Sequence, residues 1–510
     1  MCGVQAVLCL FLFLTSDWVL SDLSHDLQAG PSFTIDYIKN HFVKDGRVFR
    51  YVSGSIHYFR VLPSSWSDRL WKLRMAGFNT VQTVVEWSSH EPEPSVYDFS
   101  GNHDLEQFIR TAQQEDLLVI LRVGPYICAE RDMVYLHDFD NGLDSAGKEM
   151  ALVLLLQKLA RGLDAILALN ASVNIYMFHG GTSYGLTSGS TLNQGFQSCP
   201  TSYDYDAPVS EAGDPTPKYF ALRNVISKYM VMPPGPLPQP SPKGAYGTVQ
   251  LEALASAQQV GALLQAATHP WPLTFEQLHV PNGLILYKTV LPFRIPDPAR
   301  LSINNVHDRG YVFVDDQYVG LVSREQKLYD LAVSALPGHT ITIIVESRGR
   351  VFSGPHINDF KGLTTNVTVN GHVLEGWTMT PLPLTNKTRL NSALHLFSRS
   401  ISHALLGTPQ GGMIFYHGTF SIPQEEPHPL DTFLRLDGWS KGLAWVNDFC
   451  LGRYWPVVGP QVTLYVPQGV LRKGTNKLLV LELENAPCQT PNTCHVTLQD
   501  TPELDGPTPH

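Results

Sequence analysis

The spacing of hydrophobic positions changes once along this chain, near residue 240. Before that point, short apolar runs alternate with amphipathic stretches of helical period. After it, apolar and polar residues alternate with a period of two between Gly, Pro and Asn turns. The first pattern predicts a parallel α/β domain over residues 30–230. The second predicts antiparallel β-sandwiches or jelly rolls over 244–380 and 381–500, after a proline-rich linker at 231–243.

The first half of the chain contains four segments that read as barrel strands. The apolar run that begins at Leu117 is typical of a strand buried on both faces of a parallel sheet. An N-terminal hairpin with an Asp-Gly turn is expected over 30–53. The other strands are expected at 54–60, 79–87 and 171–180, and the helices at 66–75, 105–114, 148–169 and 217–229.

These segments are too few for a closed barrel. A (β/α)₈ barrel uses about 250 residues and rarely fewer than about 200. Roughly 175 residues separate Gly54 from Tyr229, and four strands cannot close a barrel. Residues 131–147, where further strands would follow, are polar and without period. The pattern therefore predicts an incomplete barrel.

Composition and the N-terminus narrow the class of protein. The chain carries 36 Lys and Arg against 46 Asp and Glu, a formal charge of −10 without basic blocks, which disfavours nucleic acid and anionic membranes as partners.

The apolar run Val4–Leu14 predicts a signal peptide over residues 1–21 and the secretory pathway. A buried helix is the alternative, disfavoured because nothing amphipathic follows. No later run reaches the ~18 apolar residues that a membrane span requires.

Cysteines and sequons fit an oxidising compartment. Cys488 and Cys494 flank a short loop and are the natural disulfide pair, and an odd number of other cysteines remains after signal removal. Asn366 and Asn386 lie in turn-rich sequons and are expected glycan acceptors, whereas Asn170 abuts an apolar strand and is expected to be buried. No spacing predicts a metal site, and no cofactor is expected.

Two carboxylates and two tyrosines are candidates for sugar chemistry. Glu86 and Glu130 each follow a neighbouring strand at its C-terminal end, where barrel active sites form. Retaining glycoside hydrolysis needs two carboxyl groups ~5 Å apart. Alternatively, Glu130 only accepts hydrogen bonds from sugar hydroxyls and Glu86 sits on a loop. Tyr203 and Tyr205 alternate with aspartates and either contact a sugar or form an exposed turn.

Motifs in both halves of the chain point to one family. In the first half they are Gly54-Ser-Ile-His-Tyr, Gly124-Pro-Tyr-Ile-Cys-Ala-Glu130, Ala171–Thr182 and Thr201–Gly213. In the second half they are Asn305–Tyr311, Asn358–Gly362, Gly438-Trp-Ser-Lys-Gly and Leu451-Gly-Arg-Tyr-Trp455. These motifs closely resemble glycoside hydrolase family 35, in particular the animal lysosomal β-galactosidases and the β-galactosidase-1-like proteins. The resemblance covers nearly the whole chain, from about residue 33 to about residue 500.

The resemblance implies a (β/α)₈ barrel followed by two β-domains, the second a galactose-binding-like jelly roll. It also implies removal of terminal β-galactose with retention through two glutamates. The family places these glutamates in an Asn-Glu-Tyr-Gly motif after the fourth strand and a Ser-Glu-Phe/Tyr-Tyr-Thr-Gly-Trp motif after the seventh. Neither motif occurs in this sequence. The residues that match the family stop at Glu130 and resume near Leu156. This is the pattern expected if strands 4–7 of the family's barrel had been deleted.

The remaining departures concern the sugar pocket. Arg131-Asp132 stands where the family has Trp-Glu, and Val84 replaces a tyrosine that contacts galactose. By motif match, Ala129, Glu130 and either Tyr205 or Tyr203 could still contact galactose. Cys488 and Cys494 align with a family disulfide.

We therefore expect a secreted or lysosomal member of the β-galactosidase family, with a truncated barrel and neither catalytic glutamate. One rival hypothesis is residual hydrolysis in which Glu130 acts with Glu86 or Asp132. Another is a galactoside-binding pseudoenzyme, and a third is a skipped-exon product that does not fold stably. Galactosides are the expected ligands, and the sequence is compatible with a homo-oligomer.

Overall fold

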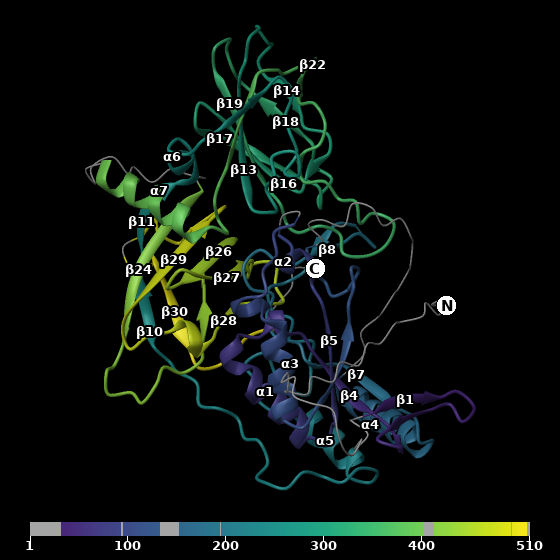
Figure 1. Cartoon of the computed structure of the whole chain (residues 1–510). Coiled ribbons are helices and arrows are strands. Elements are labelled where there is room, and N and C mark those ends of the chain that lie inside the picture. The colour runs from purple at the N-terminus through teal and green to yellow at the C-terminus, as the bar shows by residue number, and fades with distance from the viewer. Residues whose placement is uncertain are drawn as a thin grey trace, which may run out of the picture. The chain divides into compact units, whose positions relative to one another are not determined.

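The computed structural model describes residues 32–92, 95–132, 152–193, 195–400, 413–490 and 492–506 (Figure 1). The chain forms two compact units. The first unit comprises Met1–Ile127, Ser145–Thr182 and Tyr203–Ser241, and the second comprises Cys128–Asp144, Ser183–Ser202 and Pro242–His510. The expected signal peptide and the aperiodic residues after Asp132 lie outside the described residues, so those expectations stay predictions.

The first unit begins with the predicted hairpin. Strands β1 (Phe33–Asp36), β2 (His41–Lys44) and β3 (Arg47–Phe49) form an antiparallel sheet in that order. The turn between β2 and β3 is Asp45-Gly46, and both residues have a positive φ, of 50° and 74°. This is the backbone that an Asp-Gly hairpin turn requires.

A four-stranded parallel sheet forms the core of the first unit. Its strands are β4 (Val52–Ile56), β5 (Thr80–Val84), β6 (Leu118–Arg122) and β7 (Val173–His179). They lie in the order β6-β5-β4-β7, so β7 pairs with β4 although many residues separate them in sequence. The predicted four parallel strands are present. Strand β6 is less buried than predicted, because it is an edge strand and its ends, Leu118 and Arg122, are only half-buried.

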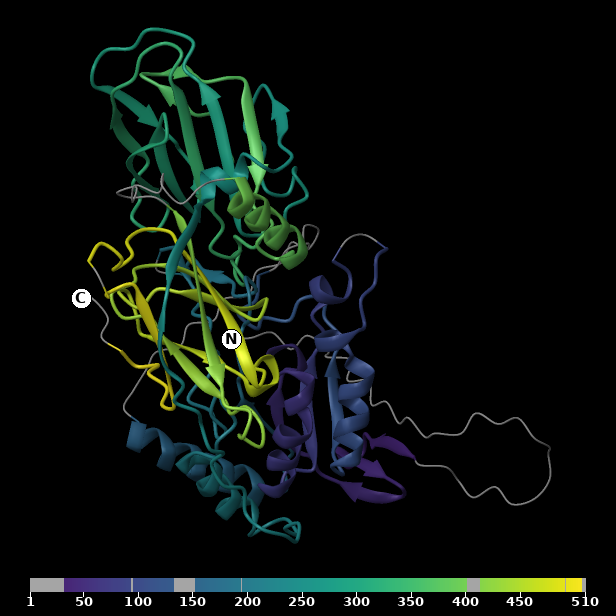
Figure 2. The ribbon, with the colours of Figure 1, turned by 90° about the vertical axis from the view of Figure 1, so that its left-hand side faces the viewer.

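The helices of the first unit follow the predicted periodicity. Helices α1 (Trp66–Met75) and α3 (Leu105–Gln114) have the predicted limits and lie alongside each other (Figure 2). Asp104 caps the N-terminus of helix α3, because its side chain accepts a hydrogen bond from the N–H of Gln107. The remaining helices are α2 (Trp87–His90), α4 (Leu152–Ala168) and α5 (Pro217–Ile226). Helices α4 and α5 pack against each other.

The second unit contains a first β-sandwich. Its larger sheet has the order β12-β23-β13-β19-β16-β17, and its smaller sheet has the order β18-β14-β21-β22. Aromatic and branched side chains fill the core, including Tyr287, Trp377 and Leu301. The strands are β12 (Ala267–His269), β13 (Leu284–Val290), β14 (Ala299–Ser302), β16 (Arg309–Val314), β17 (Gln317–Ser323), β18 (Asp330–Val333), β19 (Thr340–Glu346), β21 (Thr368–Val369), β22 (His372–Val373) and β23 (Trp377–Pro381). The short strands β15 (Val306–His307) and β20 (Gly362–Leu363) pair separately.

A second β-sandwich follows, with sheet orders β11-β24-β29-β26-β27 and β10-β30-β25-β28. Its core contains Trp439, Leu434 and Val480. The strands are β10 (Gly247–Gln250), β11 (Glu252–Ser256), β24 (Ile414–Ile422), β25 (Thr432–Arg435), β26 (Gly442–Val446), β27 (Phe449–Tyr454), β28 (Thr463–Val466), β29 (Gly474–Glu482) and β30 (His495–Gln499). Strands β10 and β11 precede the first sandwich in sequence and yet pair within the second.

Helices α6 (Ala257–Gly261) and α7 (Lys387–Ser400) supply part of a further core in the second unit. This core joins Leu286 of β13 to Phe415 of β24 and Leu443 of β26, so one continuous apolar interior connects the sheets of the two sandwiches. The α/β domain followed by all-β domains is therefore confirmed. The domain limits at 244–380 and 381–500 stay predictions.

The cysteines follow the sequence prediction. Cys488 and Cys494 form the predicted disulfide, and the other cysteines of the described residues, Cys128, Cys199 and Cys450, are not in a disulfide. Asn366 and Asn386 are exposed. The prediction that Asn170 is buried is wrong: it is exposed in the turn between α4 and β7, where its side chain accepts a hydrogen bond from Arg50.

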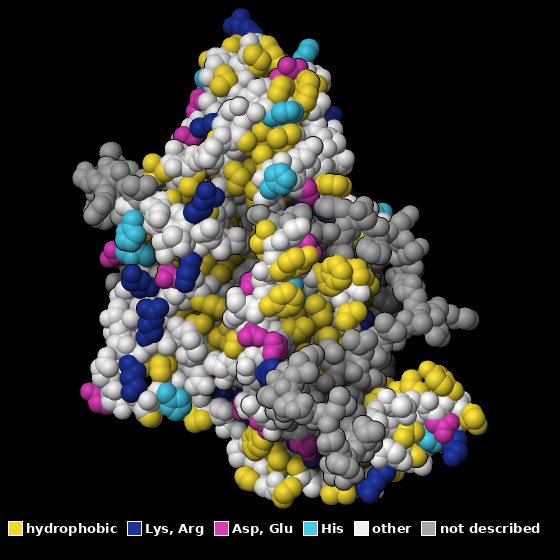
Figure 3. All heavy atoms as spheres, in the orientation of Figure 1, with side chains coloured by type: hydrophobic (Ala, Val, Ile, Leu, Met, Phe, Trp, Pro, Cys, Tyr) yellow, Lys and Arg dark blue, Asp and Glu magenta, His cyan; other side chains and the backbone are white. Residues whose placement is uncertain are grey.

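The visible surface mixes charge and apolar character. In Figure 3 acidic, basic and hydrophobic side chains are interspersed, and Lys and Arg follow one another down the left-hand side, over the second sandwich. Among the helices of the described residues, none is both long and apolar enough to span a bilayer.

Candidate functional site

Aromatic side chains gather in the first unit, from elements far apart in sequence. His57 directly follows β4, Tyr176 lies on β7, and Tyr203 and Tyr205 come from the loop after residue 200. The N–H of Tyr203 donates to the carbonyl of Gly181 at 2.9 Å, which ties this loop to the end of β7. The sequence-predicted tyrosines therefore lie together at one site.

Arg60 organises the buried side of this aromatic cluster. Its Nη1 lies 2.7 Å from Nδ1 of His57, and its guanidinium carbon lies 3.7 Å from the ring centre of Tyr203. Only 1% of Arg60 is exposed. A buried guanidinium over a phenol face is a strong cation–π arrangement, so Arg60 fixes the orientation of both rings.

The outer side of the cluster faces solvent. Tyr176 and Tyr205 are 37% and 53% exposed, and their ring centres lie 5.5 Å apart in an edge-to-face arrangement. The hydroxyls of Tyr176 and Tyr203 are hydrogen-bonded at 2.7 Å. Exposed phenol rings can stack on the apolar face of a sugar while their hydroxyls bond its OH groups. The cluster therefore has the chemistry of a carbohydrate-binding surface.

Glu86 directly precedes α2. Its carboxylate accepts a hydrogen bond from Ser89, and its side chain is buried. The neighbouring His90 contacts the Tyr58 hydroxyl through Nε2, and burial lowers the pKa of His90. Glu86 therefore lies in the irregular segment between β5 and α2, which agrees with the hypothesis that it sits on a loop.

Ala129, Glu130 and Asp132 belong to the second unit, whereas Glu86, Tyr203 and Tyr205 belong to the first. Ala129 is buried, and Glu130 is half-buried with a φ of 50°. The backbone carbonyl of Glu130 accepts a hydrogen bond from the N–H of Gly189.

Asp132 is built into the interior of the second unit. Its side chain is 2% exposed, and its Oδ1 lies 3.0 Å from Nη1 of Arg350. Arg350 also pairs with Glu276, and its pKa is raised by these two carboxylates against the effect of burial. Asp132 is thus held as the partner of a buried cation.

Sequence reasoning missed His57, Arg60 and Tyr176. His57 could have been found, because it directly follows a predicted strand at the end where barrel sites form. Tyr176 could not, because it lies within a strand whose apolar neighbours dominate the pattern.

Three family models match the chain. The model for "Glycosyl hydrolases family 35" matches residues 41–136 and 142–229. "Beta-galactosidase, first all-beta domain" matches 272–383, and "Beta-galactosidase, galactose-binding domain" matches 413–476. The beta-galactosidase of Bos taurus is 36% identical, with 92% of this chain and 94% of the relative covered. The chain belongs to glycosyl hydrolase family 35. The resemblance found in the sequence motifs is confirmed.

Other relatives agree with this family assignment. The beta-galactosidase of Homo sapiens is 37% identical, with 92% of this chain and 90% of that protein covered. The beta-galactosidase-1-like protein of Mus musculus is 35% identical, with coverage of 89% and 90%. Solved structures resemble the chain only weakly. The α-L-rhamnosidase of Streptomyces avermitilis gives a TM-score of 0.15 at 14% identity, covering 48% of this chain and 25% of that chain.

The alignment to the bovine relative extends over 619 positions, although this family 35 chain has 510 residues. At least 109 aligned positions of the relative therefore have no counterpart here.

Proposed function

We propose that this family 35 protein binds galactosides without hydrolysing them by double displacement. A retaining glycosidase needs one carboxyl as acid/base and a second as nucleophile, so losing both leaves no covalent route. Neither of the family's two glutamate motifs occurs in the sequence.

The observation that carries this proposal is the strand order β6-β5-β4-β7. In a closed eight-stranded barrel the first strand pairs with the second and the eighth. Strand β4 pairs with β5 on one side and with β7 on the other. This supports the view that β7 is the family's eighth strand, and that strands 4–7, with the glutamates that follow the fourth and seventh, are missing from the barrel.

The alignment length supports the same proposal. The alignment covers 94% of the bovine relative, and yet at least 109 of the aligned positions have no residue in this chain. The missing positions therefore lie inside the aligned region, as an internal deletion would leave them. A stretch of this size can hold several βα units.

Galactoside binding is proposed from the aromatic cluster. Tyr203 and Tyr205, expected from the family motif to contact galactose, lie beside Tyr176 and His57. Their rings and hydroxyls need no catalytic carboxylate to hold a sugar. The contacts expected at Ala129 and Glu130, which belong to the second unit, stay predictions.

The test uses purified full-length protein with a fluorogenic β-galactoside and, separately, galactose. We expect no turnover above a heat-denatured control, and a melting temperature that rises with galactose. The variant Tyr205→Ala should lose the galactose shift while Tyr37→Ala, which removes an exposed tyrosine of the N-terminal hairpin, should keep it. Turnover that collapses in Glu130→Gln would instead establish the residual-hydrolysis hypothesis.

We also propose passage through the secretory pathway, to lysosome or exterior. The N-terminal apolar run, the disulfide Cys488–Cys494 and the exposed sequons at Asn366 and Asn386 support this. Protein from a mammalian cell medium or lysosomal fraction should lose mass on treatment with an N-glycosidase. The double variant Asn366→Gln/Asn386→Gln should lose less mass, because only the sequon at Asn170 remains.

A further inference from the structure

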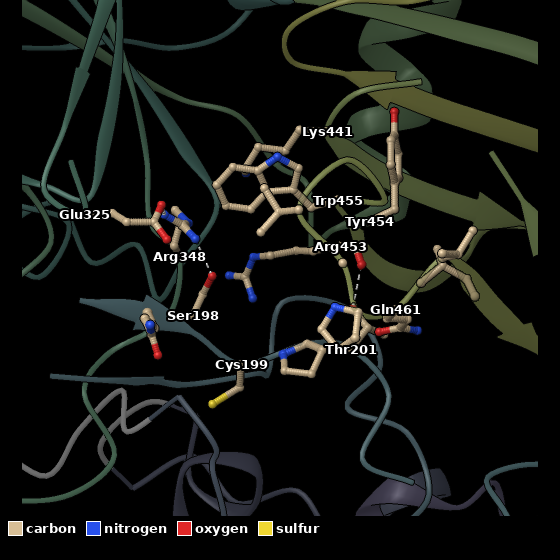
Figure 4. Close-up of a pocket in the computed structure, with 17 residues that line it drawn as sticks. Ser198, Cys199, Thr201, Glu325, Arg348, Lys441, Arg453, Tyr454, Trp455 and Gln461 are labelled. Atoms are coloured by element: carbon tan, nitrogen blue, oxygen red, sulfur yellow. Dashed lines mark hydrogen bonds and ion pairs between the residues drawn. The ribbon is translucent and has the colours of Figure 1, made fainter. Parts of the chain in front are cut away.

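A pocket of about 400 Å³ lies within the second unit (Figure 4), whereas the residues of the aromatic cluster belong to the first. It is bordered by the segment Gln197–Thr201, by Arg348 after β19, and by residues of β27 and the turn that follows it. Three cationic side chains, Arg348, Lys441 and Arg453, line it with one carboxylate, Glu325.

Two of the three cations have carboxylate partners. Nη1 of Arg348 lies 2.6 Å from Oε2 of Glu325, and its Nη2 donates to Ser198. Lys441 pairs with the buried carboxylate of Glu346. These charges are compensated inside the unit, so neither of them requires a ligand.

Arg453, the third cation of the pocket, is bonded to backbone carbonyls instead. Its Nη2 donates to the carbonyl of Ser347 at 3.1 Å, and its Nη1 makes a 3.4 Å contact with the carbonyl of Ser188. Within the described part of the chain, no carboxylate lies at ion-pair distance from Arg453 and its Nε has no hydrogen-bond partner. Carbonyls satisfy N–H groups but do not neutralise a charge, so Arg453 lacks an ion-pair partner of its own. The carboxylates of Glu346, Asp132 and Asp308 act on it only from beyond ion-pair distance.

The pocket places this guanidinium where a ligand could reach it. Figure 4 shows the Arg453 guanidinium extending into the middle of the pocket, toward Ser198 and Arg348. The indole of Trp455 lies above it and is itself 4.4 Å from the Arg348 guanidinium carbon and 5.0 Å from Nζ of Lys441. Pro200, Val458 and Pro460 add apolar wall.

We propose that this pocket binds the carboxylate of a uronic acid, alone or at the end of a glycan. A carboxylate matches the planar fork of Arg453 in a bidentate geometry and supplies the missing negative charge. The sugar ring would lie against Trp455 and the proline-lined wall, which are apolar as carbohydrate-facing surfaces are. The pocket volume lies in the range of small-ligand sites.

The test is calorimetric titration of the full-length protein with sodium galacturonate and with galactose, two sugars that differ only at C6. Galacturonate should bind and Arg453→Gln should weaken its binding about tenfold or more. The control Arg472→Gln removes an exposed arginine of the same unit and should leave the affinity unchanged. Arg453→Lys, which keeps the charge but not the fork, should bind with intermediate affinity.

Two further measurements separate a failure of this pocket proposal from misfolding of a variant and from a failure of the galactoside site. Raising NaCl from 50 to 500 mM should weaken galacturonate binding to the wild-type protein, even if an Arg453 variant does not fold. Tyr205→Ala should leave galacturonate binding intact, so a failure of the proposed galactoside site would not affect this result. Equal affinity of the Tyr205→Ala protein for galactose and galacturonate would overturn the proposal. So would equal affinity of the wild type for sodium sulfate and galacturonate, or equal galacturonate affinity of the wild type and Arg453→Gln.

Discussion

At the scale of single residues, the second unit buries charges whose surroundings set their protonation. Glu482 ends β29 with 1% of its surface exposed, and it accepts hydrogen bonds from the N–H groups of Ser440, Lys441 and Glu484. Burial raises the pKa of Glu482 to about 7, although these hydrogen bonds and one from Tyr454 lower it. The unit therefore contains an acid that titrates near neutrality.

This pKa predicts that mild acid stabilises the second unit. A carboxyl whose pKa rises on folding binds its proton more tightly when folded, so stability should increase as the pH falls from about 7 to the ordinary 4.5. The contribution is about 3 kcal/mol. Urea unfolding at pH 5, 6 and 7 should show this dependence in wild type and in the control Glu252→Gln, an exposed carboxylate. Glu482→Gln, which cannot titrate, should lack it; an unchanged slope would contradict the prediction.

A second buried cluster depends on one cation. Nζ of Lys361, fully buried, lies 2.7 Å from carboxylate oxygens of both Asp308 and Asp359. Burial alone would raise the pKa of Asp359, but the charges of Lys361 and Arg324 hold it well below its usual value.

Removing this cation would leave two buried carboxylates with less compensation. Lys361→Met should lower the free energy of unfolding by about 3–5 kcal/mol. The control Lys288→Met, at an exposed position on β13, should change it by less than about 0.5 kcal/mol. Equilibrium unfolding followed by tryptophan fluorescence measures both values, and a loss under about 1 kcal/mol for Lys361→Met would show that the cluster is not stabilised in this way.

At the scale of elements, the parallel sheet depends on close packing at β4. A Cβ placed on Gly54 would lie 2.7 Å from Cδ1 of Leu73 on α1 and 2.8 Å from Cβ of Phe178 on β7. The glycine therefore lets α1 and β7 approach the strand closely.

Two glycine substitutions should act in opposite directions. Gly54→Ala should destabilise the first unit by about 1–3 kcal/mol, because the added methyl group overpacks the interior. Gly162→Ala adds a methyl group to α4, at a point where no described atom lies within 4 Å apart from the helix's own backbone and the two flanking residues. It should stabilise by about 0.5–1 kcal/mol through helix propensity. Thermal unfolding monitored by circular dichroism distinguishes them, and equal effects would refute the packing argument.

At the scale of the whole molecule, the chain has two compact units. We expect calorimetry to resolve two unfolding transitions, since chains of several domains commonly depart from two-state behaviour. Galactose should raise the transition of the unit that holds Tyr205, and galacturonate the transition of the unit that holds Arg453. Tyr205→Ala and Arg453→Gln identify which transition is which. Both ligands raising the same transition would contradict the assignment of two sites.

The class of each half and most local elements follow from the amino-acid sequence alone. The limits of α1 and α3 follow from helical periodicity, and the Asp45-Gly46 turn follows from local backbone preference. The Cys488–Cys494 pair is also short-range, because only six positions separate the two residues. The family assignment follows from motifs that each lie within one continuous stretch of the sequence. Such features depend on neighbours along the chain, which a sequence displays directly.

Features that depend on distant residues emerge only in the folded chain. The pairing of β7 with β4, the return of β10 and β11 into the second sandwich, and the partner of Asp132 all join segments far apart in sequence. The same holds for Arg453, whose residue type predicts an ion pair and whose guanidinium instead bonds two carbonyls, with carboxylates only at longer range. Whether a charge is compensated is set by which side chains folding brings around it, and hydrophobic spacing carries no information on that.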